Sequence, residues 1–379
     1  MAGAKITIKE LFVYIGTYTL PIRFGTGQVF MGKGEGIYVY RMDQASGALE
    51  FSSKIAGVTN PSYLNFDPER RFLYAVNELK TFEGKPTGAL SAFSIDPETG
   101  ELKFINKKPT QGTDPCHVIV DKTGKCALVA NFMSGSVCVL PIQEDGSLRD
   151  ATDFVQHHGS SVNPVRQAGP HAHATTLDEE NRYAFVPDLG LDKIMVYKFD
   201  PCRGKLEPND EQWIQVKAGA GPRHLAFNPN GRYAYLINEL DSTLVAFAYD
   251  KKNGTLKEIQ TVPTLPKDFS GKSTGADVNV SPYGTFVYCS NRGHDSIVIY
   301  KIDQRTGKLT YAGHESTQGK TPRNFAIDPT GRFLLVANQD TDTIVTFRID
   351  QQTGKLTSTG YVTKVPTPVC VKMIFLESR

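Results

Sequence analysis

Residues 303–310 read DQRTGKLT, an acidic residue followed by a short polar run, a glycine and a leucine. Variants of this turn occur seven times, and their glycines lie 46 to 58 residues apart. The glycines are Gly47, Gly100, Gly146, Gly204, Gly254, Gly307 and Gly354. A repeat of about 50 residues that is rich in short alternating strands is typical of a β-propeller, in which each repeat forms one four-stranded blade.

A second repeated segment keeps the same spacing. It has two alternating apolar runs joined by a tight Pro/Gly turn, as in residues 222–239 (PRHLAFNPNGRYAYLINE). This pattern predicts a β-hairpin. Six such segments supply the first and second strands of six blades: residues 61–78, 115–132, 170–189, 222–239, 275–292 and 322–339.

The seventh blade is divided between the two ends of the chain. Residues 11–18 and 36–43 have the pattern of second and third strands without a first strand, and residues 368–376 have the pattern of a lone strand. We therefore predict an all-β fold, a seven-bladed β-propeller with four antiparallel strands per blade. Its ring is closed by a blade shared between the N- and C-termini, which removes an exposed sheet edge. Residues 1–379 then form a single domain, with residues 1–10 as a flexible N-terminal extension.

The composition excludes several classes of function. The 42 basic and 40 acidic residues give a net charge of +2, which does not favour a nucleic-acid or membrane surface. No apolar run is long enough for a transmembrane helix, and the N-terminus lacks the features of a signal peptide. The six cysteines form no C-x-x-C pair, so we expect buried reduced thiols and a cytoplasmic protein. A ring without sheet edges needs no partner, and we expect a monomer.

The phase of the repeat predicts which side chains meet. The start of each first strand and the end of each second strand share one face, near the central channel. The residues at first-strand starts are His117, His171, His173, Arg223, His224, Arg323 and Asn324, and those at second-strand ends are Glu78, Asp188, Glu239, Arg292 and Gln339. The acidic turns lie on the opposite face. We therefore expect the functional site at the channel mouth.

Arginines and carboxylates at this mouth suggest acid–base chemistry on an anion. Arg223 and Arg292 could form a fork for a carboxylate or phosphate, or could pair with Glu239 and Asp188 in a structural ion network. Glu239 is the best-placed carboxylate for a general base, and the alternative base is one of the histidines His171 and His173. Burial would raise its pKa and the arginines would lower it, and the sequence leaves that balance open.

The pair His171 and His173 allows two interpretations. Alternate residues of a strand point to one face, which suits either catalysis or metal binding. Asp188 or Glu239 could supply a third metal ligand, but the nearby arginines would repel a cation. We therefore expect no metal.

Three loop segments have further features that bear on the site. The irregular stretch before His171 is long enough to fold over the channel mouth and bring Arg166 and Gln167 to the site. Ser273 lies in a G-x-S-x-G match, but a strand follows it where a nucleophile elbow needs a helix, so we expect no nucleophile there. Residues 25–36 are glycine-rich without a following helix, and we expect a mobile loop between strands.

The chain as a whole resembles the seven-bladed propeller lactonases, a family of bacterial 6-phosphogluconolactonases related to fungal carboxy-cis,cis-muconate cyclases. The most telling segments are YIGTYT (residues 14–19), VRQAGPHAH (165–173), GPRHLAFNPNGRYAYLINEL (221–240) and SNRGHDSI (290–297). The resemblance implies that His171 or His173, together with Arg223, Glu239 and Arg292, forms the active site. It adds Arg166 as a binding residue and implies no metal or other cofactor.

The resemblance and the repeat phase lead to one expected function, the hydrolysis of a sugar lactone such as 6-phosphogluconolactone. The expected catalytic residues are His171, His173, Arg223, Glu239 and Arg292. The expected substrate-binding residues are Arg166, Gln167, His117, His224, Asp188 and Glu78. The alternatives are a muconate-type cycloisomerase, whose arginines would bind carboxylates, and a non-enzymatic propeller that binds a partner protein.

Overall fold

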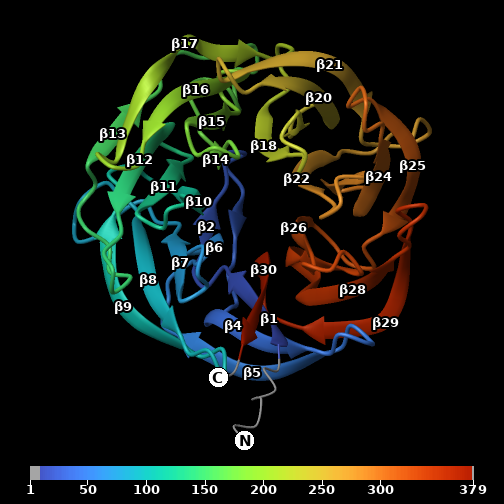
Figure 1. Cartoon of the computed structure of the whole chain (residues 1–379), viewed down its shortest axis with the longest axis horizontal. Coiled ribbons are helices and arrows are strands. Elements are labelled where there is room, and N and C mark those ends of the chain that lie inside the picture. The colour runs from blue at the N-terminus through green and yellow to red at the C-terminus, as the bar shows by residue number, and fades with distance from the viewer. Residues whose placement is uncertain (1–8, 378–379) are drawn as a thin grey trace, which may run out of the picture.

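Seven antiparallel sheets of four strands each stand side by side in a ring in the computed structural model, which describes residues 9–377 (Figure 1). This confirms the predicted seven-bladed β-propeller. From the innermost to the outermost strand, the first blade consists of β30 (Pro368–Glu377), β1 (Lys9–Thr17), β4 (Gly36–Met42) and β5 (Leu49–Ala56). The second consists of β6 (Leu64–Phe66), β7 (Phe72–Asn77), β8 (Ala89–Ile95) and β9 (Leu102–Pro109). The third consists of β10 (Pro115–Val120), β11 (Cys126–Asn131), β12 (Ser136–Pro141) and β13 (Asp153–Gln156).

The other four blades follow in chain order. The fourth consists of β14 (Thr176–Leu177), β15 (Tyr183–Asp188), β16 (Lys193–Asp200) and β17 (Lys205–Gln215), and the fifth of β18 (Pro222–Phe227), β19 (Tyr233–Asn238), β20 (Thr243–Asp250) and β21 (Thr255–Pro263). The sixth consists of β22 (Thr274–Val280), β23 (Phe286–Arg292), β24 (Ser296–Ile302) and β25 (Leu309–Ser316). The seventh consists of β26 (Pro322–Ile327), β27 (Phe333–Asn338), β28 (Thr343–Ile349) and β29 (Leu356–Lys364).

The first blade joins the two ends of the chain, as predicted. The last strand, β30, pairs antiparallel with β1 from Lys9↔Glu377 to Thr17↔Pro368, and in Figure 1 the red β30 lies beside the blue β1. β1 begins at Lys9, two residues before the expected Leu11. The rest of the expected N-terminal extension, residues 1–8, lies outside the described residues.

The repeated turn docks each blade on the preceding one. In β1, the Tyr14 hydroxyl donates to the carbonyl oxygen of Gly100 at 2.9 Å, and Gly100 packs against the Phe12 ring. A φ of +72° and the nearby ring both favour glycine at this position. Tyr288 makes the same contact with Gly354 at 2.9 Å. The sequence repeat therefore has a structural cause, since each glycine turn seats on the second strand of the preceding blade.

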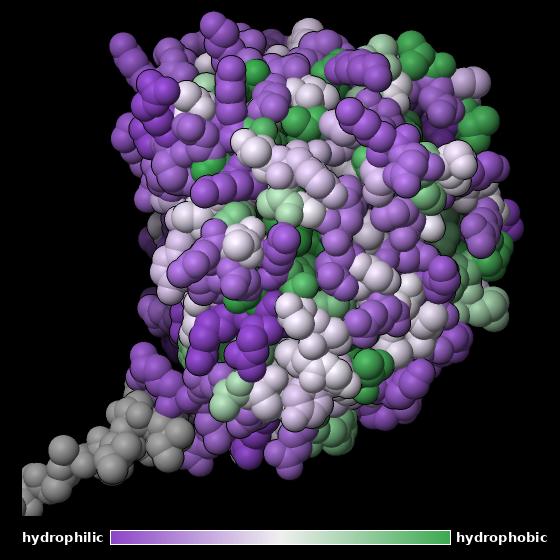
Figure 2. Space-filling model, turned by 90° about the vertical axis from the view of Figure 1, so that its right-hand side faces the viewer, coloured by the Kyte–Doolittle hydropathy of each residue, from purple (hydrophilic) through white to green (hydrophobic). Residues whose placement is uncertain are grey.

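The hydrophobic core lies between the blades. The second strands β7, β11, β19 and β27 are buried along their whole length, because both faces of each sheet pack on neighbouring sheets. The outermost strands alternate or are partly exposed, as in β17. Figure 2 views the edge of the ring on the β25 side, where hydrophilic residues predominate and hydrophobic ones are scattered in small groups.

Three further features complete the fold. A two-stranded hairpin, β2 (Ile22–Arg23) and β3 (Val29–Phe30), leaves the first blade after β1. Within residues 9–377 the only helix is the three-residue 3₁₀ helix η1 (Gln339–Thr341), and no helix of this part could span a membrane. All six cysteines are free, but Cys202 is exposed, so the expectation of buried thiols is correct for five of them.

Candidate functional site

A cavity of about 210 Å³ opens on the face where innermost strands begin and second strands end. Its walls include six charged or titratable groups, each from a different blade: Glu78, Asp114, His173, Glu239, Arg292 and Arg323. Residues up to 245 positions apart (323 − 78) therefore share one small space. The repeat phase correctly predicted this face, because each blade presents the same strand ends there.

Glu239 is the electrostatic centre of the cavity. Its Oε1 accepts from Arg166 Nη2 at 2.6 Å, and its Oε2 lies 2.9 Å from Arg292 Nη2 and 3.1 Å from Arg223 Nε. Burial alone would raise the pKa of Glu239, but the charges of the three arginines, Arg292 foremost, outweigh it and hold that pKa well below its usual range. Glu239 thus orders three guanidinium groups, and it is a poor proton acceptor near neutral pH. This differs from the role of general base expected from the sequence.

Arg223 lies beneath the main cavity. It lines a second cavity of about 10 Å³ that shares Glu78, His173 and Arg323 with the first. Besides Glu239, its guanidinium donates to the carbonyl oxygen of Ala276, and its Nη1 lies 3.3 Å from His224 Nε2. Arg292 therefore faces the main cavity, whereas Arg223 is held from several sides within the protein.

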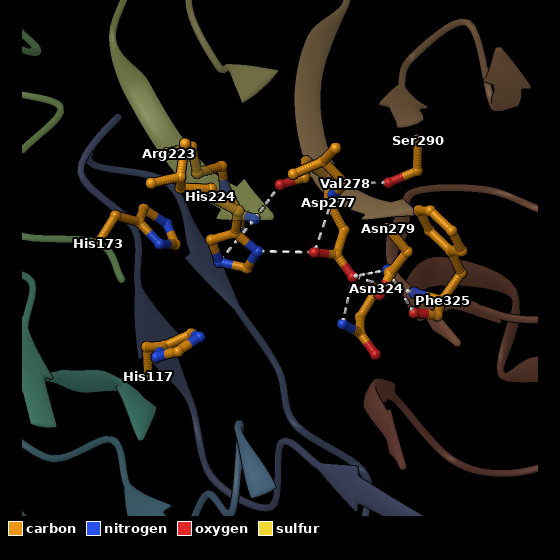
Figure 3. Close-up of polar contacts among 12 residues, drawn as sticks. His117, His173, Arg223, His224, Asp277, Val278, Asn279, Ser290, Asn324 and Phe325 are labelled. Carbon is orange, nitrogen blue, oxygen red and sulfur yellow. Dashed lines mark hydrogen bonds and ion pairs between the residues drawn. The ribbon is translucent and has the colours of Figure 1, made fainter. Parts of the chain in front are cut away.

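A buried carboxylate sets the orientation of His224 (Figure 3). Asp277 Oδ1 lies 2.7 Å from His224 Nδ1, and its Oδ2 accepts from Asn324 Nδ2 at 2.6 Å. Burial, and then the charge of Arg223, lower the pKa of His224 to about 4. The ring is therefore neutral at physiological pH: Nδ1–H donates to Asp277, and Nε2 accepts from Arg223. His224, expected to bind substrate, lines the second cavity and contacts Arg223 there.

The other histidines occupy different environments. His173 is 4% exposed and lines both cavities, and burial followed by the charge of Arg223 lowers its pKa well below the usual value. His171 is outside the cavity lining and stacks on Phe132, with ring centroids 4.7 Å apart. His117 packs on Tyr63 at 4.2 Å, deeper in the ring, and does not line either cavity. Of the three imidazoles, only His173 meets the site.

Asp188 is a structural residue rather than part of the cavity wall. It is fully buried, and its carboxylate lies 2.6 Å from His157 Nδ1 and accepts from the backbone N–H of His171 at 2.7 Å. It therefore ties both ends of the loop that includes residues 157–169 to β15. Asp188 and Glu239 were the two candidates for a third metal ligand. The carboxylate of Asp188 contacts His157, and that of Glu239 pairs with arginines.

That loop folds over the cavity as expected, but only one of its two predicted residues reaches it. Arg166 lines the cavity. Gln167 is fully buried, donates from Nε2 to the carbonyl oxygen of Leu189 at 2.8 Å, and accepts from the backbone N–H of Asn163 at 3.0 Å. The Gln167 side chain braces the loop and does not line the cavity.

The hairpin β2–β3 forms a second cover, which the sequence interpretation missed. Phe24, Phe30 and four neighbouring residues of this hairpin line the cavity, and Figure 1 shows the hairpin extending toward the centre of the ring. Phe24 and Phe30 pack with Tyr18 at centroid distances of about 6 Å. Residues 25–36, expected to be a loop between strands, thus include β3, whose Phe30 packs with Phe24 over the cavity. The two aromatic residues Phe24 and Phe30, rather than the glycines, were the sequence feature that indicated a cover.

Arg323 also lines the cavity; the repeat phase put it at the channel face, but the expected catalytic and substrate-binding sets did not include it. Its guanidinium lies over the rings of Tyr18 at 5.4 Å and Phe24 at 5.2 Å. No hydrogen bond or ion pair joins it to another residue of the part that the structure describes. Arg323 follows Pro322 just as Arg223 follows Pro222, which is why the repeat phase put both arginines at the channel face.

Two carboxyl groups share the side of the cavity next to β7. Glu78 accepts from the Tyr18 hydroxyl at 3.1 Å, and burial raises its pKa although Arg323 opposes the shift. Asp114, also absent from the predicted set, lines the same cavity and is 4% exposed. Ser273, by contrast, donates its hydroxyl to the Arg292 carbonyl oxygen at 3.0 Å, and it does not line the cavity.

Known proteins provide a whole-chain comparison. Residues 12–373 match the family described as "Lactonase, 7-bladed beta-propeller". A 6-phosphogluconolactonase of Bacillus subtilis is 38% identical over 361 residues, which cover 95% of this chain and 97% of that protein. The solved structure of a periplasmic gluconolactonase from Pseudomonas aeruginosa is 35% identical, with a TM-score of 0.88 and coverage of 97% and 99% of the two chains.

Proposed function

Because the chain belongs to the family of seven-bladed β-propeller lactonases, we propose that it hydrolyses the ring ester of a sugar lactone, with 6-phosphogluconolactone as the substrate. The observation that carries this proposal is the group of arginines with unused donors around a small closed-in cavity. Arg166 Nε and Arg292 Nε are buried without a hydrogen-bond partner in the described residues, and Arg323 faces the same space. Buried donors of this kind require an acceptor, and an anionic ligand supplies one.

The charge balance of the cavity favours an anionic substrate. Four arginines line it, namely Arg23, Arg166, Arg292 and Arg323. Of the four carboxyl groups in the lining, two have a pKa that burial raises, Glu78 and Asp114. Planar guanidinium groups bind phosphate and carboxylate oxygens through paired donors. A phosphorylated sugar lactone presents both a phosphate and a carbonyl whose oxygen becomes negative during attack.

Hydrolysis of a lactone requires three contributions from the protein. The ring must be held, the oxygen of the attacked carbonyl must be stabilised as it becomes an anion, and a proton must leave the attacking water. Arg292, fixed by Glu239 at 2.9 Å, is placed to stabilise that oxygen with a donor whose position is set before the substrate arrives. Neutral His173 contributes a hydrogen-bonding side chain to the cavity wall.

The experiment that tests the function is a ring-opening assay on a panel of aldonolactones. The wild-type protein is incubated with 6-phosphogluconolactone, glucono-lactone and unphosphorylated pentonolactones, and the rate is compared with spontaneous opening at the same pH. We expect the fastest turnover on the phosphorylated lactone and a product heavier by one water. A product of unchanged mass would indicate a cycloisomerase, and rates equal to the spontaneous ones on the whole panel would overturn the proposal.

The cellular place of the reaction is part of the proposal. Production of 6-phosphogluconate would place the protein in the pentose phosphate pathway, and we propose the cytoplasm as its compartment. The absence of disulfides among the six cysteines supports this, since free thiols are typical of reducing compartments. Fractionation of the native host with an antibody to this chain tests it, and recovery of the protein outside the cytoplasm contradicts it.

A further inference from the structure

The site described so far lacks a suitable proton acceptor. A general base works best when its pKa lies near the pH of the reaction. The pKa of Glu239 is held well below its usual range, and so is that of His173. At neutral pH both are unprotonated, but both hold an added proton too weakly to take one efficiently from water.

Asp114 has the geometry that a proton acceptor needs. It immediately precedes β10, and its backbone is held on both sides: its N–H donates to the Leu79 carbonyl oxygen at 2.8 Å, and its own carbonyl oxygen accepts from Phe132 N–H at 2.9 Å. The residue is 4% exposed and lines the same cavity as His173. Its carboxylate oxygen Oδ2 has no hydrogen-bond partner within residues 9–377. A buried acceptor oxygen left open beside a cavity points to a ligand or a reactive water.

The repeat shows that this carboxylate is not needed for the fold. Asn60, Thr321 and Thr367 stand at the corresponding place in their blades, directly before a proline and with positive φ, as Asp114 does. Their side chains are all used within the protein. Asn60 Oδ1 accepts from Thr19 N–H at 2.8 Å, and the hydroxyls of Thr321 and Thr367 each donate at 2.6 Å.

Asp114 therefore differs from its counterparts in these three blades, whose polar side chains form hydrogen bonds within the protein. A cavity-lining side chain that differs from its counterparts in the repeat, and whose buried carboxylate oxygen has no partner in the described residues, is explained by function better than by packing.

We propose that Asp114 is the general base of the ring-opening reaction. This rests on the proposed lactonase function. As the oxygen of water bonds to the lactone carbonyl carbon, the water O–H bond breaks and the proton passes to the Asp114 carboxylate. The tetrahedral alkoxide, stabilised by an arginine, then re-forms the carbonyl as the bond to the ring oxygen breaks. The ring oxygen takes the electron pair and the proton back from Asp114, and the carboxylic acid product loses its own proton to solvent.

The electrostatic surroundings suit this cycle. Burial, and then the charge of Glu78, raise the pKa of Asp114 to about 7, while Lys80 opposes the shift. Besides Asp114 and Glu78, the titratable or charged groups that line the cavity are Arg23, Cys116, Arg166, His173, Glu239, Arg292, Arg323 and Asp340. A carboxyl group with a pKa near neutrality can both accept and return a proton at physiological pH.

The test replaces Asp114 by asparagine, since Asn60 shows that an amide side chain fits this backbone conformation. For Asp114→Asn we expect kcat to fall by about 10²- to 10⁴-fold with little change in KM. The acidic limb of the wild-type pH profile of kcat/KM, with its midpoint near 7, should disappear. Asp114→Glu, which keeps a carboxylate, should recover part of the rate and of the limb.

The matched control is Asp210→Asn, at an exposed position on β17, where the rate and the pH profile should stay unchanged. Thermal melting verifies that each variant is folded. An Asp114→Asn variant with wild-type kcat and pH profile would overturn the inference. So would a rise in KM alone, because the carboxylate would then serve only to bind a sugar hydroxyl.

The same assays separate the two proposals. If the wild-type protein opens no lactone of the panel, the proposed function fails, and the inference fails with it. If the wild-type protein is active and Asp114→Asn is equally active, the lactonase function stands and only the role of Asp114 is wrong.

Discussion

The guanidinium of Arg166 lies 2.6 Å from Glu239 Oε1, and this contact joins the loop over the cavity to the end of β19, 73 residues later in the chain. The two side chains are 13% and 6% exposed. Arg166 thus closes one side of the cavity while its Nε remains without a partner in the described residues. The ion pair makes the position of the loop depend on the same carboxylate that orders Arg223 and Arg292.

The first prediction concerns the removal of this contact. Arg166→Ala should raise KM for the phosphorylated lactone by about tenfold to a hundredfold, because a hydrogen bond to a charged group contributes about 1.5–3 kcal/mol. Steady-state kinetics measures the effect. Arg149→Ala, at an exposed position on the opposite face, is the matched control. Unchanged KM in Arg166→Ala would show that the loop does not contribute to substrate binding.

The second prediction assigns the phosphate to Arg323, whose guanidinium has aromatic neighbours but no carboxylate partner among residues 9–377. Arg323→Leu should lower kcat/KM about a hundredfold for the phosphorylated lactone and less than about threefold for the unphosphorylated one, since only the first loses a charge-assisted contact. Parallel kinetics on the two substrates gives the ratio. Arg332→Leu, on the exposed turn of the same blade, should change neither. Equal losses on both substrates would place Arg323 at the lactone end instead.

The third prediction concerns Asp277, which fixes the hydrogen-bonding direction of His224 and through it Arg223 (Figure 3). Asp277→Asn should lower kcat by about tenfold or more, because the amide cannot accept every donor that the carboxylate now accepts and the imidazole loses its fixed orientation. Nitrogen NMR of the histidines measures the protonated ring nitrogen of His224 directly. Retention of the Nδ1–H form together with wild-type kcat would contradict this positioning role.

The fold was predictable because the physical constraints repeat. In six of the seven blades the turn glycine meets an aromatic side chain of the preceding blade, as Gly100 meets Phe12, so the same residues recur at a regular spacing. Closure of the ring by β30 followed from counting strands at the two ends of the chain. Such constraints are local, and a sequence pattern records them.

The site was only partly predictable because it depends on distances across the ring. The repeat phase brought His173, Glu239 and Arg292 to one cavity, but it could not tell that Gln167 turns inward to Leu189. Nor could it resolve the pKa of Glu239, which depends on how many arginines reach one carboxylate. Asp114 was missed because its role is visible only when its open oxygen is compared with the satisfied side chains at corresponding positions.

The fourth prediction tests the ionisation of Asp114 through protein stability, without an activity assay. Burial, and then Glu78, raise the pKa of this carboxyl from 3.8 to about 7. Between these values the unfolded chain has released a proton that the folded protein retains. The contribution of Asp114 to the free energy of unfolding is therefore largest below about pH 4 and is lost as the pH rises toward 7.

Asparagine carries no such proton, so the stability of Asp114→Asn relative to wild type should increase between about pH 4 and pH 8, by up to about 4 kcal/mol. Urea unfolding of both proteins at several pH values measures the difference, and Asp210→Asn supplies the control without a pH-dependent gain. A difference that is constant over this range would mean that Asp114 ionises normally. If Asp114→Asn is more stable than wild type at high pH but has lost turnover, then the Asp114 carboxyl group lowers the stability of the fold and is needed for the reaction.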